Sequence, residues 1–520
     1  MSLYDQNTII TGLSNNEAME VLAKYIDNSL DTLNLKQAKH ALELCEDLSS
    51  RVEGKMVPEL FYFRANAWSV IREIKHQDES NVWQWNQPEL LEEIYWLRSA
   101  IQSESFSQLD SIRQCQILIN TGNIVNHIGR PIEAIEYWQR ALNILPRFGM
   151  ALGNLGSGYE HYAKILYDRG HAAILFKKAH DLLRKTSDKG CIWDSYEYKS
   201  IQDEMLNLAS HIKANVNFND LEQIPLEGFS LGKSKIEKRY RKWVLENTLF
   251  INPLNDVGAH TIAAQDVLHL PGIVTNTGDP PELIGFYNQI KQEFVTARYL
   301  LWKGFTESED VKRHYSDNNV LLINTLDYPV YGIAIEQIKL AFRSAYSLFD
   351  KIALFINDYW QLDIPEKKIN FQSVWFEFKG GQKSKELNPK FLNHTNLMLR
   401  GLYWLSKDFI EYDSSSNRVL GKTMEPDAYL LRSIRNDLEH KYLKVHDDIW
   451  SYAHCDPEKN AINKTSHHIS TTDLTSKTLR LMKLARAALI YLSLAIHIEE
   501  KMNDNERSGL FIPIVLPNWP

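Results

Sequence analysis

The chain has 520 residues, which leaves room for about two to four domains, and its hydrophobic fraction of 44% is ordinary for a globular protein. Its formal net charge of −8 argues against a general electrostatic binder of nucleic acid, so any contact with RNA would need local basic clusters. The four cysteines, at positions 45, 115, 191 and 455, include no Cys-x-x-Cys pair, which argues against a disulfide framework and against a zinc ribbon.

The sequence gives no indication of export or of a membrane span. The N-terminus, MSLYDQNTII, lacks a basic region and a continuous apolar stretch, so we expect no signal peptide. The longest apolar run, near residues 485–498, is too short to cross a bilayer and contains His497, which favours a buried core helix. We therefore expect a cytoplasmic protein with reduced thiols and no membrane partner.

Residues 1–215 carry helical patterns, which sharpen from Ile117 onward. The spacing of small and large residues there fits the helix hairpin of a tetratricopeptide repeat, at Leu118, Gly122, Val125, Gly129, Ala134, Trp138, Ala141 and Pro146. A second unit follows, with Leu152, Leu155, Gly156, Tyr159, Ala172, Phe176 and Ala179. Because such units bury their faces only when stacked, we predict a tetratricopeptide-like helical array over 1–215. It could bind a protein or peptide, or serve as a structural scaffold.

Residues 216–285 differ in character, with five prolines and many glycines and asparagines, and we interpret them as a connector with one helix at Lys235–Asn247. The stretch Leu249 to Asp256, LFINPLND, is expected to be an ordered loop packed on the bundle that follows. Two basic clusters are candidates for contacts with RNA. One is the segment KSKIEKRYRK at 233–242, and the other consists of Lys477, Arg480, Lys483 and Arg486.

Residues 286–505 predict an all-α helical bundle, because long segments with helical spacing alternate with short connections. The expected helices lie at 287–305, 333–360, 396–409, 427–447 and 475–501. Residues 366–385, with aromatic residues followed by Gly380-Gly381, predict a small extended insert. The apolar, proline-rich segment 506–520 is expected to pack as an extended tail.

The helix predicted at 427–447 has a dense apolar stripe and a polar arc with the means for acid–base chemistry. Glu439 lies four residues after Arg435 and could hold it, and Asn436 has the same relation to His440 and could orient its imidazole. Such an imidazole can transfer protons near neutral pH, and an arginine can bind a phosphate. Further candidates for RNA contacts are Arg432, Lys441 and Lys444. The same spacing also fits an ordinary solvated helix face with a salt bridge.

The motif Arg435-Asn436-x-x-x-His440, on the third main helix of an all-α bundle, resembles the HEPN superfamily. The segments WVLEN at 243–247 and LFINPLND at 249–256 look like a signature of bacterial HEPN proteins that carry N-terminal tetratricopeptide-like helices. The resemblance implies a metal-independent endoribonuclease, a homodimer that brings two Arg–His helices together, and a role in stress or anti-phage defence. It assigns catalysis to Arg435 and His440, with Asn436 and Glu439 as helpers, and requires no cofactor.

Two other functions remain open on the sequence: an inactive HEPN domain that binds RNA or nucleotide, and a helical scaffold whose Arg–His face binds a partner. The polar loop with His446, Asp447, Asp448, His454, Cys455, Asp456, His467 and His468 has irregular ligand spacing, so we predict no metal there. We also expect the array to regulate the bundle, and the bundle to fold after deletion of 1–215.

Overall fold

The computed structural model describes residues 10, 12–76, 84–194, 198–218, 224–275, 278–309, 314–392, 394–409, 412–413, 418–419, 423–448, 466–504, 507 and 514–517. Within these residues there are fifteen α-helices and three two-stranded sheets, which confirms the all-α prediction. Most of the predicted tail, and the loop residues His454, Cys455 and Asp456, lie outside the described part.

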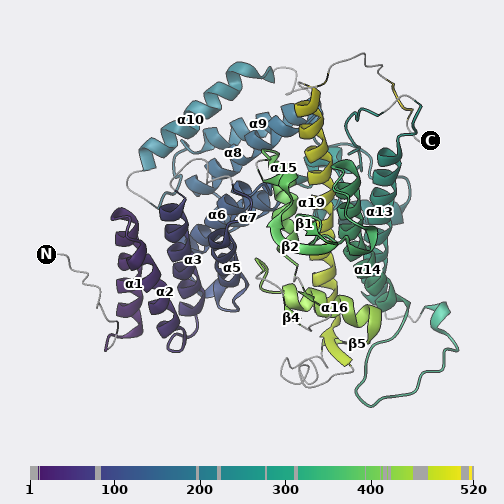
Figure 1. The fold of residues 1–520 in the computed structure, drawn as a ribbon, viewed down its shortest axis with the longest axis horizontal. Coiled ribbons are helices and arrows are strands. Elements are labelled where there is room, and N and C mark those ends of the chain that lie inside the picture. Colours follow the sequence, from purple (N-terminus) through teal and green to yellow (C-terminus); the bar gives the residue numbers. More distant parts are fainter. Residues whose placement is uncertain are drawn as a thin grey trace.

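The N-terminal helices stack in chain order and form one side of the molecule (Figure 1). Trp138 packs between two glycines of neighbouring helices, and a Cβ atom at Gly122 or Gly158 would lie 2.5 Å or less from its ring. The small residues therefore permit the close helix approach that their spacing suggested. The helices are α1 (Asn15–Asp31), α2 (Leu35–Ser49), α3 (Met56–Lys75), α5 (Pro88–Gln102), α6 (Ser111–His127), α7 (Pro131–Ile144), α8 (Gly149–Ile165), α9 (Arg169–Lys185) and α10 (Tyr198–Asn215).

The C-terminal bundle is built around α19, which packs against α13, α14 and α15 (Figure 1). Asn396 accepts a hydrogen bond from Leu399 N and so caps α15 at the predicted start of that helix. The helices are α12 (Lys235–Glu246), α13 (Glu282–Glu309), α14 (Ile333–Tyr359), α15 (Leu397–Ser406), α16 (Ala428–His440) and α19 (Thr471–Asp504). The strands are β1 (Phe376–Lys379), β2 (Gln382–Leu387), β3 (Tyr412–Asp413), β4 (Arg418–Val419), β5 (Tyr442–His446) and β6 (Ser466–Ser470).

The extended insert is a hairpin, because β1 and β2 pair antiparallel around Gly380 and Gly381. Both glycines have positive φ, +59° and +76°, which glycine adopts without steric cost. Helix α19 is long and apolar enough to cross a membrane by composition, but 83% of its most apolar window is buried inside the protein.

Direct backbone and aromatic contacts join the array to the bundle. In the turn between α6 and α7, Gly129 has φ +90° and approaches Gly401 of α15 so closely that a Cβ on either residue would meet backbone atoms at 2.1 Å or less. Trp85, which precedes α5, stacks on Phe391 with ring centroids 5.5 Å apart and donates a hydrogen bond to the carbonyl of His394. The two regions therefore share one continuous apolar core.

Buried charges cross the same boundary. The carboxylate of Asp408, just after α15, accepts hydrogen bonds from Arg98 Nη1 at 2.5 Å and from Arg130 Nη2 at 2.6 Å. Burial alone would raise the pKa of Asp408, but the two arginine charges outweigh it and hold the pKa at about 2. Deleting 1–215 would leave this buried carboxylate without its partners. The structure therefore argues against the expectation that the bundle folds without the array.

The LFINPLND stretch is wedged between the array and α19. Asp256 accepts a hydrogen bond from Arg486 Nη1 at 2.6 Å, and the hydroxyl groups of Tyr159 and Tyr162 on α8 donate to its carbonyl and carboxylate. Arg486 also donates to the carbonyl of Asn252 at 2.8 Å. This stretch of the predicted connector is thus an ordered, buried part of the contact between the two regions.

Candidate active site

Helix α16 ends at His440, so the prediction of one helix through Asp447 is wrong. Lys441 turns extended, and β5 begins at the next residue and pairs in parallel with β6. Leu443 and Val445 are buried, whereas Tyr442 and Lys444 are more exposed, an alternation that suits a strand. The pairing of this strand with β6 replaces the helix that the spacing predicted. Asp427 occupies the predicted N-cap position, but its side chain makes no cap hydrogen bond.

Arg435 is half-buried where α16 crosses α14. Its guanidinium lies 5.8 Å from the centre of the Tyr346 ring, and Nη1 donates to Asn436 Oδ1 at 3.2 Å. Asp350, one turn along α14, carries a largely buried carboxylate whose pKa is raised by burial and lowered in part by the amide of Phe371 and the charge of Arg435. Burial, with a contribution from Asp350, also raises the pKa of Tyr346 to about 12. Arg435 therefore rests on a neutral phenol and keeps donors for a ligand.

Glu439 does not hold Arg435, contrary to the prediction. Its carboxylate pairs instead with Arg343 of α14, Nε to Oε1, at 3.7 Å. The i,i+4 spacing permits the predicted pair, but a basic side chain from the neighbouring helix competes for the same carboxylate. Glu439 therefore links α16 to α14, and Arg435 is left to its amide and aromatic contacts.

His440 is exposed at the last position of α16. The structure describes no hydrogen bond by which Asn436 would orient His440 as predicted, and the Asn436 oxygen accepts one from Arg435. Asn436 thus belongs with Arg435 in the structure, and the imidazole of His440 faces solvent. Because α16 rises about 1.5 Å per residue, the two ends of the motif are roughly 7.5 Å apart along the helix axis. That separation is suited to two groups that act on different sides of one phosphate.

The three further candidates for RNA contacts differ in their surroundings. Lys441 is exposed, with Nζ 4.0 Å from a carboxylate oxygen of Asp437, whereas Arg432 is half-buried beside Tyr346. Lys444 is bound to Asp327. Burial would raise the pKa of Asp327, but hydrogen bonds from Lys444 and Thr325 hold it at about 2. The charge of Lys444 is therefore already compensated, which makes it the weakest of the three candidates.

Sequence reasoning missed a pair of contacts behind α16. Buried Asp437 accepts a hydrogen bond from Ser433 at 3.2 Å and lies 3.8 Å from Nδ1 of His467 on β6. Burial lowers the pKa of His467, and the Asp437 charge only partly offsets this. The rings of His446 and His468 are stacked with Nε2 and Nδ1 2.9 Å apart. Alternation along 442–446 was the signal that could have revealed the sheet.

The two predicted basic clusters differ in whether their charges are paired or exposed. On α19 every member is paired with a carboxylate: Lys477 with Asp427, Arg480 with Glu425, Lys483 with Glu136, and Arg486 with Asp256. On α12 and just before it, five basic side chains are exposed, namely Lys233, Lys235, Lys238, Arg239 and Lys242. The cluster at 233–242 therefore presents positive charge to solvent, whereas the α19 cluster holds the molecule together.

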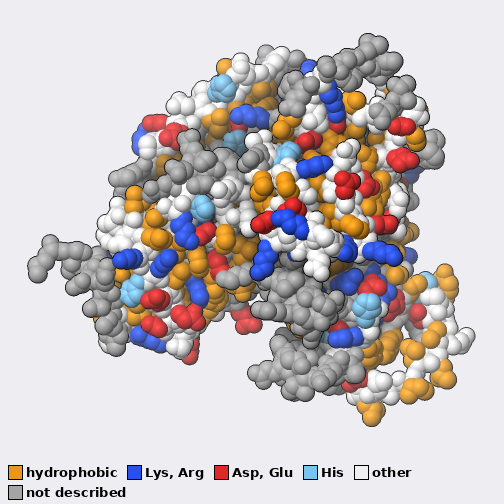
Figure 2. Space-filling model, in the orientation of Figure 1, with side chains coloured by type: hydrophobic (Ala, Val, Ile, Leu, Met, Phe, Trp, Pro, Cys, Tyr) orange, Lys and Arg blue, Asp and Glu red, His pale blue; other side chains and the backbone are white. Residues whose placement is uncertain are grey.

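The loop between α13 and α14, residues 314–332, carries exposed apolar side chains, visible at the lower right of Figure 2. Leu321, Ile323 and Leu326 are 89%, 79% and 76% exposed. The loop is anchored beside the site, because Val330 N donates to the carbonyl of Val445 on β5 at 2.7 Å. We call this segment the α13–α14 loop. Among the described residues no group of three or more His, Cys, Asp or Glu side chains is arranged to hold a metal ion.

Comparison with known proteins identifies the bundle. Residues 274–499 match the family model described as LA2681-like HEPN, and this range contains α13 to α16 and most of α19. No curated protein and no solved structure matches the chain. The family match, over less than half of the chain, supports a HEPN-type domain in its C-terminal part. HEPN domains are often ribonucleases, so the match points to RNA as a partner.

Proposed function

We propose that the protein is a metal-independent endoribonuclease that uses Arg435 and His440. One observation carries the proposal: within the matched HEPN domain, α16 presents a half-buried arginine and, at its end, an exposed histidine. A structural salt bridge would have neutralised Arg435, and its contacts are instead an amide and an aromatic ring. A guanidinium with unused donors can bind a phosphate, and an exposed imidazole can transfer a proton.

The reaction proposed is attack of the RNA 2′-hydroxyl on the adjacent phosphorus, with release of the 5′-oxygen of the next nucleotide. His440 takes the proton from the 2′-hydroxyl, or gives one to the leaving 5′-oxygen. Arg435 stabilises the charge that develops on the phosphate oxygens, and Asn436 holds the guanidinium or the phosphate. The ring of Tyr346 packs against the guanidinium of Arg435 and helps to position it. The products are a 2′,3′-cyclic phosphate and a free 5′-hydroxyl.

We further propose that two copies assemble with their α16 helices close together. A single α16 offers one arginine and one histidine, and a two-fold contact would place two of each around one substrate. The α13–α14 loop supports this arrangement, since it carries exposed apolar side chains and is bonded through Val330 to β5, the strand that begins two residues after the end of α16. Light scattering on the native chain should give twice the 60.4 kDa chain mass, and a Leu321→Ser/Ile323→Ser chain should give one chain mass. A monomeric native chain with full activity would refute the arrangement.

The biological role we propose is a cytoplasmic effector in stress or anti-phage defence, a toxin whose activity depends on the N-terminal array. Support comes from the HEPN match together with the extensive buried contact between array and bundle, because a signal received by the helices has a direct structural route to the domain. A protein or peptide is the ligand class we propose for the array.

The test compares the native chain with an Arg435→Ala/His440→Ala chain on labelled RNA. We expect cleavage by the native chain in EDTA, no cleavage of a 2′-deoxy substrate, and products with 2′,3′-cyclic phosphate ends. The double variant should be inactive but fold normally. If the native chain binds RNA but does not cleave it, and the folded double variant also binds RNA, an RNA-binding HEPN domain would be favoured instead. Strict magnesium dependence or 5′-phosphate products would overturn the chemistry.

A further inference from the structure

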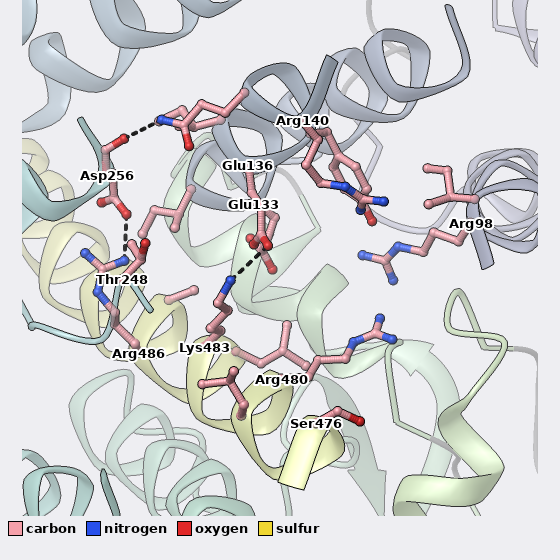
Figure 3. A pocket seen from close by; sticks show the side chains of 18 of the residues that line it. Arg98, Glu133, Glu136, Arg140, Thr248, Asp256, Ser476, Arg480, Lys483 and Arg486 are labelled. Atoms are coloured by element: carbon pink, nitrogen blue, oxygen red, sulfur yellow. Dashed lines mark hydrogen bonds and ion pairs between the residues drawn. The ribbon is translucent and has the colours of Figure 1, made fainter. Parts of the chain in front are cut away.

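A cavity of about 660 Å³ lies between the array and the bundle, walled by α5 and α7 on one side and α19 on the other (Figure 3). Neither Arg435 nor His440 lines it, so it is separate from the site described above. Its volume is within the range of about 300–1,000 Å³ typical of small-molecule sites, and sites of this kind are common at domain interfaces. Its apolar wall consists of Ile101, Ile132, Ile135, Leu479, Leu484 and Ala487.

One end of the cavity is rich in guanidinium groups. The side chains of Arg98, Arg140 and Arg480, from three different helices, point toward the same part of the cavity in Figure 3. Arg98 and Arg480 are close neighbours, because both contact Glu425. Arg98 is buried, and its Nε has no acceptor. Arg140 is exposed and lies over the ring of Tyr137 at 5.8 Å, and within the described chain it has no ion pair.

At the far end of the cavity every basic group that lines it is matched with a carboxylate. Arg486 is bound to Asp256, and Lys483 to Glu136 on the side wall (Figure 3). At the other end Arg98 and Arg480 also contact carboxylates, those of Asp408, Glu425 and Asp427. Arg140 is left there without an ion pair among the described residues, beside the aliphatic wall from α7 and α19. Guanidinium groups bind phosphate oxygens through paired hydrogen bonds, whereas aliphatic walls suit the organic part of a ligand.

From this geometry we infer that the cavity binds a phosphorylated small molecule, with its phosphate groups at Arg98, Arg140 and Arg480. The site also reaches the start of the Arg–His helix. Arg480 binds Glu425, and its Nη1 is 3.9 Å from Asp427, the residue that precedes α16. A phosphate that recruits Arg480 competes with both carboxylates, so binding loosens the first turn of α16. The cavity thereby couples a ligand held partly by the array to the helix that carries Arg435.

Isothermal titration calorimetry on the full chain tests the site, with ATP, inorganic pyrophosphate and adenosine as probes. We expect ATP and pyrophosphate to bind and adenosine not to bind, because the phosphates supply the contacts with the arginines. Arg140→Ala should weaken binding of both by about tenfold or more, since it removes a charged donor. Arg184→Ala, which removes an exposed arginine of α9, is the matched control and should bind normally. Absence of binding, or equal binding by Arg140→Ala, would overturn the site.

Hydrogen exchange tests the coupling without relying on nuclease activity. With ATP bound, amides in the first turn of α16, residues 428–432, should exchange at least about threefold faster, and the Arg140→Ala chain should show no change at the same ATP concentration. ATP binding without faster exchange would disprove the coupling while leaving the site intact. Because neither measurement involves RNA, failure of the proposed ribonuclease activity would be recognised separately.

Discussion

Helices α19 and α16 both carry rows of basic side chains, but the rows have opposite surroundings. On α19 the four members of the basic cluster each meet a carboxylate contributed by the array, the connector or the segment before α16. On α16, Arg435 contacts an amide and a ring, and His440 is exposed. Charges in the α19 cluster therefore hold two regions together, whereas Arg435 on α16 keeps donors that a ligand could use. A basic cluster in a sequence acquires its role only when its partner carboxylates are known.

The largest effect expected is on catalysis, from His440→Ala. Loss of a proton-transfer group should lower the rate of RNA cleavage by about two to four powers of ten. Because His440 is exposed, the free energy of unfolding should change by less than about 0.5 kcal/mol. His211→Ala, at an exposed position of α10, is the control and should leave the rate unchanged. Cleavage assays with urea denaturation decide the matter, and an active His440→Ala chain would remove His440 from the mechanism.

Asp408→Ala should mainly lower the free energy of unfolding, in contrast to His440→Ala, which should mainly lower the cleavage rate. The substitution leaves Arg98 and Arg130 buried without their shared carboxylate, which should cost about 3–5 kcal/mol of unfolding free energy. Asp203→Ala removes an exposed carboxylate that pairs with Lys199, and it should cost less than about 1 kcal/mol. Urea denaturation measures both. A loss below 1 kcal/mol for Asp408→Ala would mean that the two arginines find other acceptors.

Low pH should lower the stability of the folded chain through His467, which lies beside Asp437 of α16. Burial lowers the pKa of His467 below 6.5, and Asp437 only partly compensates, while Lys441 acts in the same direction as burial. The unfolded chain therefore binds more protons than the folded chain as the pH falls below about 6.5, and stability decreases. The Tm should be lower at pH 5.5 than at pH 7.5, and His467→Gln should reduce that difference. A steeper pH dependence in the variant would show that the pKa is raised.

The smallest effect is expected for Glu439→Gln. Its partner is Arg343 at 3.7 Å, and both side chains are partly exposed, so the pair should contribute at most about 1 kcal/mol. RNA cleavage should fall by less than about fivefold, as should that of an Arg343→Gln chain. A hundredfold loss confined to Glu439→Gln would place this carboxylate in the chemistry and would contradict the separation between supporting and reacting groups on α16.

Periodicity predicted the helices well where one face is buried along the whole element. Helix α14 was predicted at 333–360 and is observed at Ile333–Tyr359, because its apolar side chains keep helical spacing throughout. Strands β5 and β6 were missed because their pairing joins residues 24 positions apart, as in Tyr442 with Ser466, and helical and strand patterns overlap in so short a segment. The Arg435-to-His440 motif itself was visible in the sequence.

Partners within the site could not be predicted from local spacing. In the sequence Glu439 stands one helical turn from Arg435, which predicts a salt bridge between them. In the structure Glu439 pairs with Arg343 of α14 instead, and no pattern near residue 439 indicates that contact. Asp408 had no signal at all, since its arginines lie 310 and 278 positions earlier in the chain. Interactions of this kind depend on the packing of whole regions, and one sequence without its fold does not specify them.

The position of Asp408 also has a consequence for the order of events during synthesis. Arg98 and Arg130, buried side by side with like charge, emerge from the ribosome long before the carboxylate that neutralises them. At about 5–20 residues per second, the 278 positions between Arg130 and Asp408 correspond to roughly 14–56 s of translation. During that interval the buried contact of Asp408 with both arginines cannot form. Helix α16 follows Asp408 in the chain, so the Arg–His motif is made only after the array can be completed.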